Sequence, residues 1–130
     1  AEPKETLQQL FTHLKPGGTL SLMFYNRNSA IMRTVLKGNY FRNTTPFQFG
    51  RSKSLTPGNP LDPNDVLEWL REWNISVTSK CGVRIFNDYL HAPVPDDKLD
   101  ELIAVEKDHC RIEPFASLGR YIHLVCEKPL

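Results

Sequence analysis

Two adjacent side chains near the end of the 130-residue sequence are suited to holding an anion. Arg120 and Tyr121 follow Gly119, and both can donate hydrogen bonds to a negatively charged group. The planar guanidinium of arginine matches the two oxygens of a carboxylate, and the tyrosine hydroxyl would add a second donor. These residue types therefore favour a clamp for a carboxylate. The alternative is a surface arginine at the start of an edge strand.

Three other residues lie where a ligand could reach them. Tyr25 and Asn26 end an apolar segment that reads as a strand, and ligands of open α/β sheets gather beyond the carboxyl ends of parallel strands. Arg84 interrupts the apolar run 83–86. We therefore count all three with Arg120 and Tyr121 as candidate substrate-binding residues. The alternatives are a core position for Tyr25 and a solvent-facing strand position for Arg84.

Charge is distributed unevenly along the chain, although the formal net charge is only +1. Between Thr6 and Leu61 there are seven basic residues and no acidic one, whereas residues 62–130 hold thirteen acidic and eight basic residues. This layout favours an anionic partner for the first stretch, or mutual neutralisation of the two stretches. The candidate RNA-binding residues are five bases of the first stretch: Arg33, Lys37, Arg42, Arg51 and Lys53.

The segment 40–60 reads as a long loop in which aromatic rings are interleaved with bases. Rings can stack on nucleobases while the charges meet phosphates, and a hydrophobic flap over the core is the alternative. The histidines and three cysteines lack the spacing of zinc ligands, so we predict no metal. The cysteine count is odd and the sequence has no signal-peptide pattern, which favours the cytoplasm. No apolar run approaches the roughly 20 residues of a membrane span, so we expect no membrane contact.

Hydrophobic periodicity predicts the elements that must position these side chains. The expected helices are 6–14, 28–36, 66–73 and 96–111, and the expected strands are 19–26, 74–86 and 120–127. The first strand is apolar on both parities, which predicts burial on both faces, and Gly82 is expected to bend the second. In the last helix, the predicted core residues are Leu99, Leu102, Ile103, Val105 and Cys110. This alternation predicts one α/β unit with about three strands.

The segment 14–26, Leu-Lys-Pro-Gly-Gly followed by an apolar strand, resembles the fifth-strand region of class I S-adenosylmethionine-dependent methyltransferases. Further motifs in the same order resemble the C-terminal half of a tRNA-modifying branch of that family. They lie at 20–26, 38–41, 55–57, 62–63, 82–90 and 118–123. The resemblance implies the C-terminal portion of a Rossmann-like fold, in which the three strands are the fifth to seventh and the last is antiparallel.

The resemblance also implies an activity, a cofactor and a partner. The expected reaction moves a methyl group from S-adenosylmethionine to the carboxylate of 5-carboxymethoxyuridine at the wobble position of tRNA. Such a carboxylate is already ionised at neutral pH, so positioning rather than a strong general base is required. Arg120 and Tyr121 would be the carboxylate clamp, and the tRNA anticodon region would be the partner.

The glycine-rich loop and the acidic ribose-binding residue of such enzymes belong to the half that residues 1–130 do not resemble. The Gly17-Gly18 pair follows a helix instead of preceding one, so it is not expected to cradle the cofactor. We therefore expect residues 1–130 to form a single unit that lacks a cofactor site and is inactive alone. We also expect that this unit could form a homodimer through an exposed sheet edge. The alternatives are a non-catalytic nucleic-acid or protein interaction module and a methyltransferase for small carboxylic acids.

Overall fold

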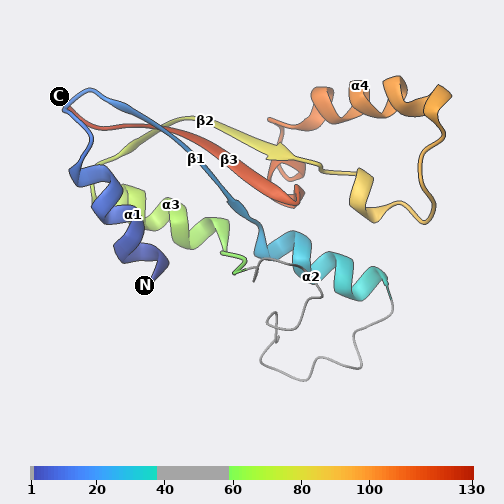
Figure 1. Cartoon of the computed structure of the whole chain (residues 1–130), viewed down its shortest axis with the longest axis horizontal. Coiled ribbons are helices and arrows are strands. Elements are labelled where there is room, and N and C mark those ends of the chain that lie inside the picture. The colour runs from blue at the N-terminus through green and yellow to red at the C-terminus, as the bar shows by residue number, and fades with distance from the viewer. Residues whose placement is uncertain (1, 38–58) are drawn as a thin grey trace.

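The computed structural model describes residues 2–37 and 59–130, and its centre is a three-stranded sheet (Figure 1). The strands are β1 (Thr19–Tyr25), β2 (Ser76–Val83) and β3 (Tyr121–Glu127), in the spatial order β1-β3-β2. β3 pairs antiparallel with both neighbours. This confirms the predicted α/β class with an antiparallel last strand. The alternative that Arg120 starts an edge strand is wrong, because β3 is central.

Helices α1 (Pro3–Thr12) and α3 (Pro63–Glu72) cover one face of the sheet (Figure 1). α3 begins where the Asp62 side chain accepts a hydrogen bond from the amide of Asn64 at 2.9 Å, which satisfies one of the free amides of the first turn. The core between the helices and the sheet consists of Leu7, Phe11, Val66, Leu70, Ile75, Ile122, Leu124 and Cys126. Both helices were predicted from their apolar spacing.

The turn after α1 is closed by the other end of the described chain. Gly17 has φ +74, a backbone conformation that favours glycine. The Nζ atom of Lys128 donates to the carbonyls of Phe11 at 2.9 Å and Leu14 at 2.8 Å. A cation at a helix C-terminus satisfies free carbonyls and interacts favourably with the helix dipole. Lys128 thereby ties the last strand to the first helix.

The second face of the sheet is open along β1. The exposure of β1 residues alternates, and Met23 on the open face is 59% exposed. The prediction that this strand is covered on both faces is therefore wrong. Apolar residues on both parities could not reveal that α1 and α3 lie on the same side of the sheet.

Helix α2 (Arg27–Leu36) follows β1, and the Asn26 side chain caps it by accepting from the amide of Asn28 at 3.0 Å. The sequence predicted its range within one residue. Its apolar spacing also predicts a buried stripe with Met32, Val35 and Leu36 and an opposite, exposed basic face with Arg33. In the structure the three apolar residues are exposed, Arg33 is half-buried and Ser29 is buried, so that prediction is wrong. The predicted loop 40–60 falls mostly on residues 38–58, which lie outside the described ranges.

Helix α4 (Leu99–His109) follows the 3-10 helix η2 (Asp96–Lys98) and has no buried residue. The predicted core positions Leu99, Ile103 and Val105 are all more than 40% exposed. The inner face holds the other two predicted core residues, Leu102 and Cys110, together with Glu106 and His109, and all four are half-buried. The prediction is wrong for three of the five residues because a carboxylate with backbone partners, described below, decides which side of α4 faces inward.

Two short helices complete the fold near the end of β2: η1 (Asn87–Tyr89) and η3 (Phe115–Leu118). The β2 strand is irregular between Val77 and Ser79, so the predicted bend at Gly82 is wrong. Gly82 serves close packing instead, because a Cβ atom there would lie 2.6 Å from the carbonyl oxygen of Ala116. η3 therefore lies directly against the end of β2.

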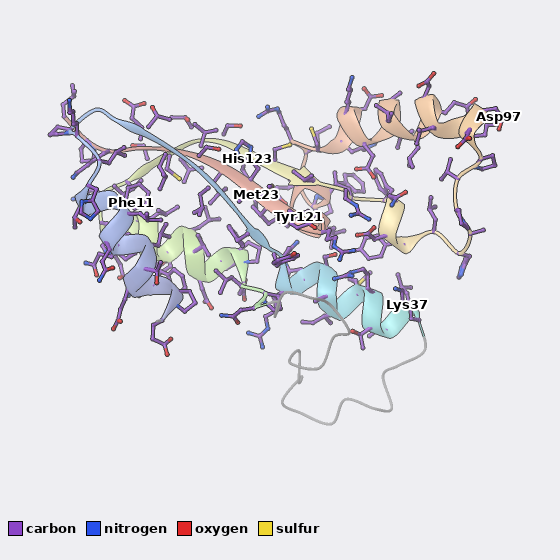
Figure 2. All side chains as sticks on the ribbon, in the orientation of Figure 1. Phe11, Met23, Lys37, Asp97, Tyr121 and His123 are labelled. Carbon is purple, nitrogen blue, oxygen red and sulfur yellow. The ribbon has the colours of Figure 1, made fainter. Side chains whose placement is uncertain are left out.

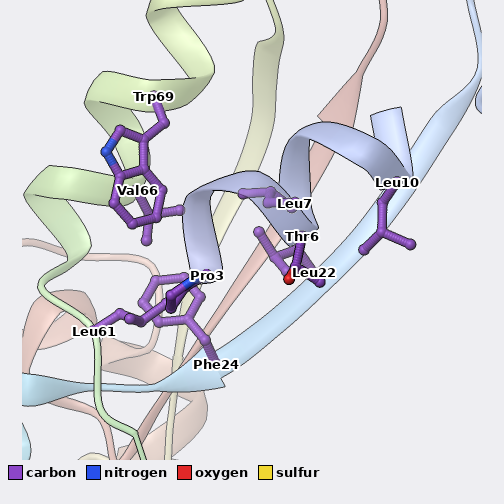
Figure 3. Close-up of a pocket in the computed structure, with 9 residues that line it drawn as sticks. All are labelled: Pro3, Thr6, Leu7, Leu10, Leu22, Phe24, Leu61, Val66 and Trp69. Atoms are coloured by element: carbon purple, nitrogen blue, oxygen red, sulfur yellow. The ribbon is translucent and has the colours of Figure 1, made fainter. Parts of the chain in front are cut away.

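An apolar pocket of about 220 Å³ lies between α1, α3 and β1 (Figure 3). Its lining includes Leu7, Leu22, Phe24 and Trp69, and Thr6 supplies a side-chain hydroxyl. Such a lining offers almost nothing to orient a charged ligand. None of the helices in residues 2–37 and 59–130 has the length and apolar composition of a membrane span.

Candidate anion-binding site at the strand ends

The ends of β1 and β2 meet the start of β3 at one end of the sheet. Tyr121 is paired with Tyr25 on one side and with Val83 on the other. The ladder continues one step further, because the amide of Asn26 donates to the Arg120 carbonyl at 3.0 Å and the Arg120 amide to the Arg84 carbonyl at 3.1 Å. This pairing brings together all five predicted substrate-binding residues, although they are up to 96 positions apart in the sequence.

A carboxylate holds two of the arginines. Asp88, on η1, accepts from Arg84 Nη2 at 2.5 Å through Oδ1 and from Arg120 Nη1 at 3.3 Å through Oδ2. The Asp88 side chain is only 7% exposed. Burial alone would raise the pKa of Asp88, but Arg84, the Asn87 amide and Arg120 outweigh it, so the pKa lies below its ordinary value. Asp88 is therefore ionised at neutral pH.

A third arginine approaches the same carboxylate from α2. Burial lowers the pKa of Arg33, and the positive charge of Arg120 lowers it further, whereas Asp88 raises it. We call Arg33, Arg84 and Arg120, together with Asp88, the arginine cluster. It carries three positive charges and one negative charge, so its net charge favours binding of an additional anion.

The backbone at Arg84 is held in an unusual conformation by α4. Arg84 has φ +59, a region that costs a non-glycine residue about 1–2 kcal/mol. The Glu106 carboxylate accepts from the amides of Ile85 and Phe86, both at 2.7 Å, and of Asn87 at 3.1 Å. Three charge-assisted hydrogen bonds can offset this strain. Arg84 thus lies in a turn directly after β2, so the predicted strand position is wrong, whereas the residue is exposed as that alternative expected.

Aromatic rings lie beside the arginine cluster. The ring of Tyr121 has its centroid 5.0 Å from that of Tyr25, and the guanidinium carbon of Arg120 lies 5.8 Å from the Tyr121 centroid. A cation within about 6 Å of an aromatic face is attracted to it. The structure therefore places the ring of Tyr121 where it can orient Arg120.

Asn26 is fully engaged inside the protein. Its Nδ2 atom donates to the carbonyls of Ser117 and Gly119, both at 2.8 Å, and its side chain caps α2. Asn26 is 1% exposed. It therefore anchors the turn that leads into Arg120, and it has no donor left for a ligand among the bonds described.

Tyr89 and Ser29 lie close to each other and to Arg33. The Tyr89 hydroxyl donates to the Leu118 carbonyl at 2.9 Å. Burial raises the pKa of Tyr89, although the Ser29 hydroxyl and the charge of Arg33 act against that shift. Tyr89 is therefore neutral at physiological pH, and its hydroxyl is used as a donor within the fold.

The candidate RNA-binding residues fall into two groups. Arg33 joins the arginine cluster, whereas Lys37 is exposed and lies at the far end of α2 from Tyr121 (Figure 2). The remaining three, Arg42, Arg51 and Lys53, lie outside the described residues. Among residues 2–37 and 59–130, no three histidine, cysteine or carboxylate side chains gather as a metal site would require.

Two residues of the site were missed by sequence reasoning. Asp88 had a usable signal, since it is four positions after Arg84 and is the only acidic residue between Glu72 and Asp96. Glu106 had none, because its partners are backbone amides of a distant loop. Asp97, by contrast, was predicted to lie at a helix start. It lies in η2, directly before α4, and is far from Tyr121 (Figure 2).

The Gly17-Gly18 pair does not fit the adenosyl cofactor that the methyltransferase resemblance implies. The Gly17 amide already donates to the carbonyls of Lys128 and Pro129, and the Gly18 amide donates to that of Lys15. These glycines follow α1, so they cannot present free amides at a helix N-terminus. This pair is therefore not a cradle for the cofactor.

Comparison with known proteins finds similarity to two curated proteins. No protein-family model matches the chain. Curated tRNA 5-carboxymethoxyuridine methyltransferases of Escherichia coli O157:H7 and Escherichia coli strain K12 are each 39% identical to it over 130 residues, or 99% of the chain. The chain spans half the length of each relative. Over its whole length it is thus similar to tRNA 5-carboxymethoxyuridine methyltransferases, as the predicted C-terminal half would be.

Proposed function

We propose that these 130 residues form the substrate-binding half of an enzyme that transfers a methyl group from S-adenosylmethionine to the carboxylate of 5-carboxymethoxyuridine at the wobble position of tRNA. The observation that carries the proposal is the arginine cluster, whose positive charges outnumber its single carboxylate. A relative whose name specifies a carboxylated uridine supports the assignment of the anion.

The chain's own contribution to such a reaction is to bind and orient the carboxylate. Arg120 is held from two sides, by Asp88 through an ion pair and by Tyr121 through its ring. A guanidinium fixed in this way can present its remaining donors in one plane to two oxygens. Holding the nucleophilic oxygen in a fixed direction lowers the entropic part of the barrier. No proton has to be removed, because the carboxylate is ionised.

Methyl transfer requires a methyl donor, and the Gly17-Gly18 pair has no free amides to hold it. We therefore propose that the cofactor is bound by the half of the relatives' length that this chain does not match, and that the 130 residues alone bind substrate without turnover. Tyr25 and Tyr121, on the open face of the sheet, would lie beside the base that carries the carboxylate.

A binding experiment on the chain itself tests this function. Two anticodon stem-loops of identical sequence would carry either 5-carboxymethoxyuridine or 5-methoxyuridine, which lacks the carboxylate. We expect the first to bind at least tenfold more tightly, because a charge-assisted bidentate pair contributes about 1.5–3 kcal/mol. Fluorescence anisotropy at fixed salt would measure both affinities. Equal affinity for the two RNAs would refute the proposal.

The Arg120→Lys variant provides the matched control, since it keeps the charge but removes the planar pair of donors. We expect the variant to lose most of the preference for the carboxylated RNA while keeping its affinity for the methoxy RNA. Binding of the free carboxylated nucleoside as tightly as the stem-loop would instead favour a small carboxylic acid as the substrate.

A further inference from the structure

Arg33 is a half-buried cation for which residues 2–37 and 59–130 provide no ion pair. Its neighbours Arg84 and Arg120 both pair with Asp88, whereas no carboxylate among the described residues lies within ion-pair distance of Arg33. The Nε atoms of Arg33 and Arg120 are both buried and lack hydrogen-bond partners among the same residues. One buried donor on each of two neighbouring guanidinium groups is thus unused in the described part of the chain.

This arrangement is costly unless an anion completes it. Burying a charge without a partner is unfavourable, and a like charge beside it adds repulsion. The lowered pKa of Arg33 reflects both effects, since burial and Arg120 are its main causes.

We propose that Arg33 is a substrate-binding residue for the carboxylate, acting with Arg120, and not a contact to the tRNA backbone. The inference rests on the function proposed above. Asp88 acts as a positioning residue, because it fixes Arg84 and Arg120 while leaving Arg33 for the incoming anion. The site would thus bind one planar oxyanion between the guanidinium group of Arg33, on α2, and that of Arg120, at the start of β3.

A phosphate of the RNA backbone has the same oxyanion chemistry, so the test must separate the two sources. The pair of stem-loops described above does this, because both RNAs carry the same phosphates and only one carries the carboxylate. The test variant is Arg33→Met, which keeps the length of the side chain. The matched control is Lys37→Met, an exposed base one helical turn further along α2.

We expect Arg33→Met to weaken binding of the carboxylated RNA about tenfold and to change binding of the methoxy RNA less than about twofold. Lys37→Met should weaken the binding of both RNAs equally or leave both affinities unchanged. If Arg33→Met weakens the binding of both RNAs equally, Arg33 contacts a phosphate and the inference is wrong. The inference is also wrong if Arg33→Met changes neither affinity. If wild type itself does not distinguish the RNAs, the proposed function fails as well.

A measurement on the free protein gives a second readout. Arg33→Met removes a half-buried cation beside Arg120 for which the described residues provide no ion pair, so its thermal midpoint should stay unchanged or rise. A midpoint lowered by more than about 4 °C would show that Arg33 already has a stabilising partner within the protein, and would overturn the inference. Arg33→Lys, which keeps the charge without the fork, should recover less than half of the lost preference.

Discussion

Asp88 is the residue on which the geometry of the site depends. It is the single carboxylate in contact with two guanidinium groups, and its side chain is almost fully buried. A carboxyl whose pKa is lower in the folded than in the unfolded state stabilises the fold above its unfolded pKa. That stabilisation disappears as the pH falls through the lower, folded pKa.

The Asp88→Asn variant tests this at the residue scale. At pH 7 we expect its free energy of unfolding to be lower than that of wild type by roughly 1–2 kcal/mol, because two ion pairs are lost and Arg84 is half-exposed. The difference should shrink as the pH falls below 3.8, the ordinary pKa of the group. Denaturant titrations of both proteins at several pH values would measure it. A difference that stays constant with pH would contradict the assigned charge.

Tyr121 offers a second test at this scale, since its ring and its hydroxyl make separable contributions. The ring lies against the Arg120 guanidinium. We expect Tyr121→Phe to retain the preference for the carboxylated RNA within about threefold and Tyr121→Leu to lose about tenfold. The same anisotropy titration would measure both. Equal losses in the two variants would show that the hydroxyl is the important donor, as the sequence predicted.

At the scale of elements, helix α4 acts as a support for the Arg84 turn. Glu106 is its main connection, through three backbone amides. In Glu106→Gln one acceptor oxygen becomes an NH₂ group that faces those amides. We expect the free energy of unfolding to fall by about 2 kcal/mol and the carboxylated RNA to bind more weakly. Glu101→Gln, an exposed change on the same helix, should alter stability by less than about 0.5 kcal/mol.

Elements with one continuous apolar stripe were predictable from the sequence. α3 and β3 follow directly from their spacing, because Val66 and Leu70 lie one turn apart and Ile122, Leu124 and Cys126 alternate along the strand. α4 was not predictable in the same way. Its apolar residues are spread around the helix, and a single acidic side chain with distant backbone partners determines which side faces the sheet.

The site was predictable in part from the strand ends, but not as a cluster of charges. Tyr25 and Asn26 were expected at the end of one strand and Arg120 at the start of another, whereas Arg84 was expected inside a strand. Arg33 was expected on an exposed basic face, because Met32, Val35 and Leu36 resemble a buried stripe. The charge of Asp88 and the packing of α2 against η1 and η3 reverse that arrangement, and both arise only from tertiary contacts.

At the scale of the whole molecule, Lys128 connects the last strand to the first helix. Its ammonium group donates to two carbonyls at the end of α1. We expect Lys128→Met to lower the free energy of unfolding by about 1–2 kcal/mol and to speed amide exchange in α1. Lys4→Met, which removes only an exposed pair with Glu72, is the matched control and should cost less than about 1 kcal/mol.

The strand order β1-β3-β2 sets the sequence of events by which the sheet can form. Within residues 2–37 and 59–130, β1 and β2 both pair with β3, which is the last of the three in the chain. During synthesis on the ribosome, these two pairings can therefore form only after residues 121–127 have left the exit tunnel. Pairing β1 with β3 closes a loop of about one hundred residues, which is a slow, non-local step. The arginine cluster, built where these strands meet, can form only at the end of this process.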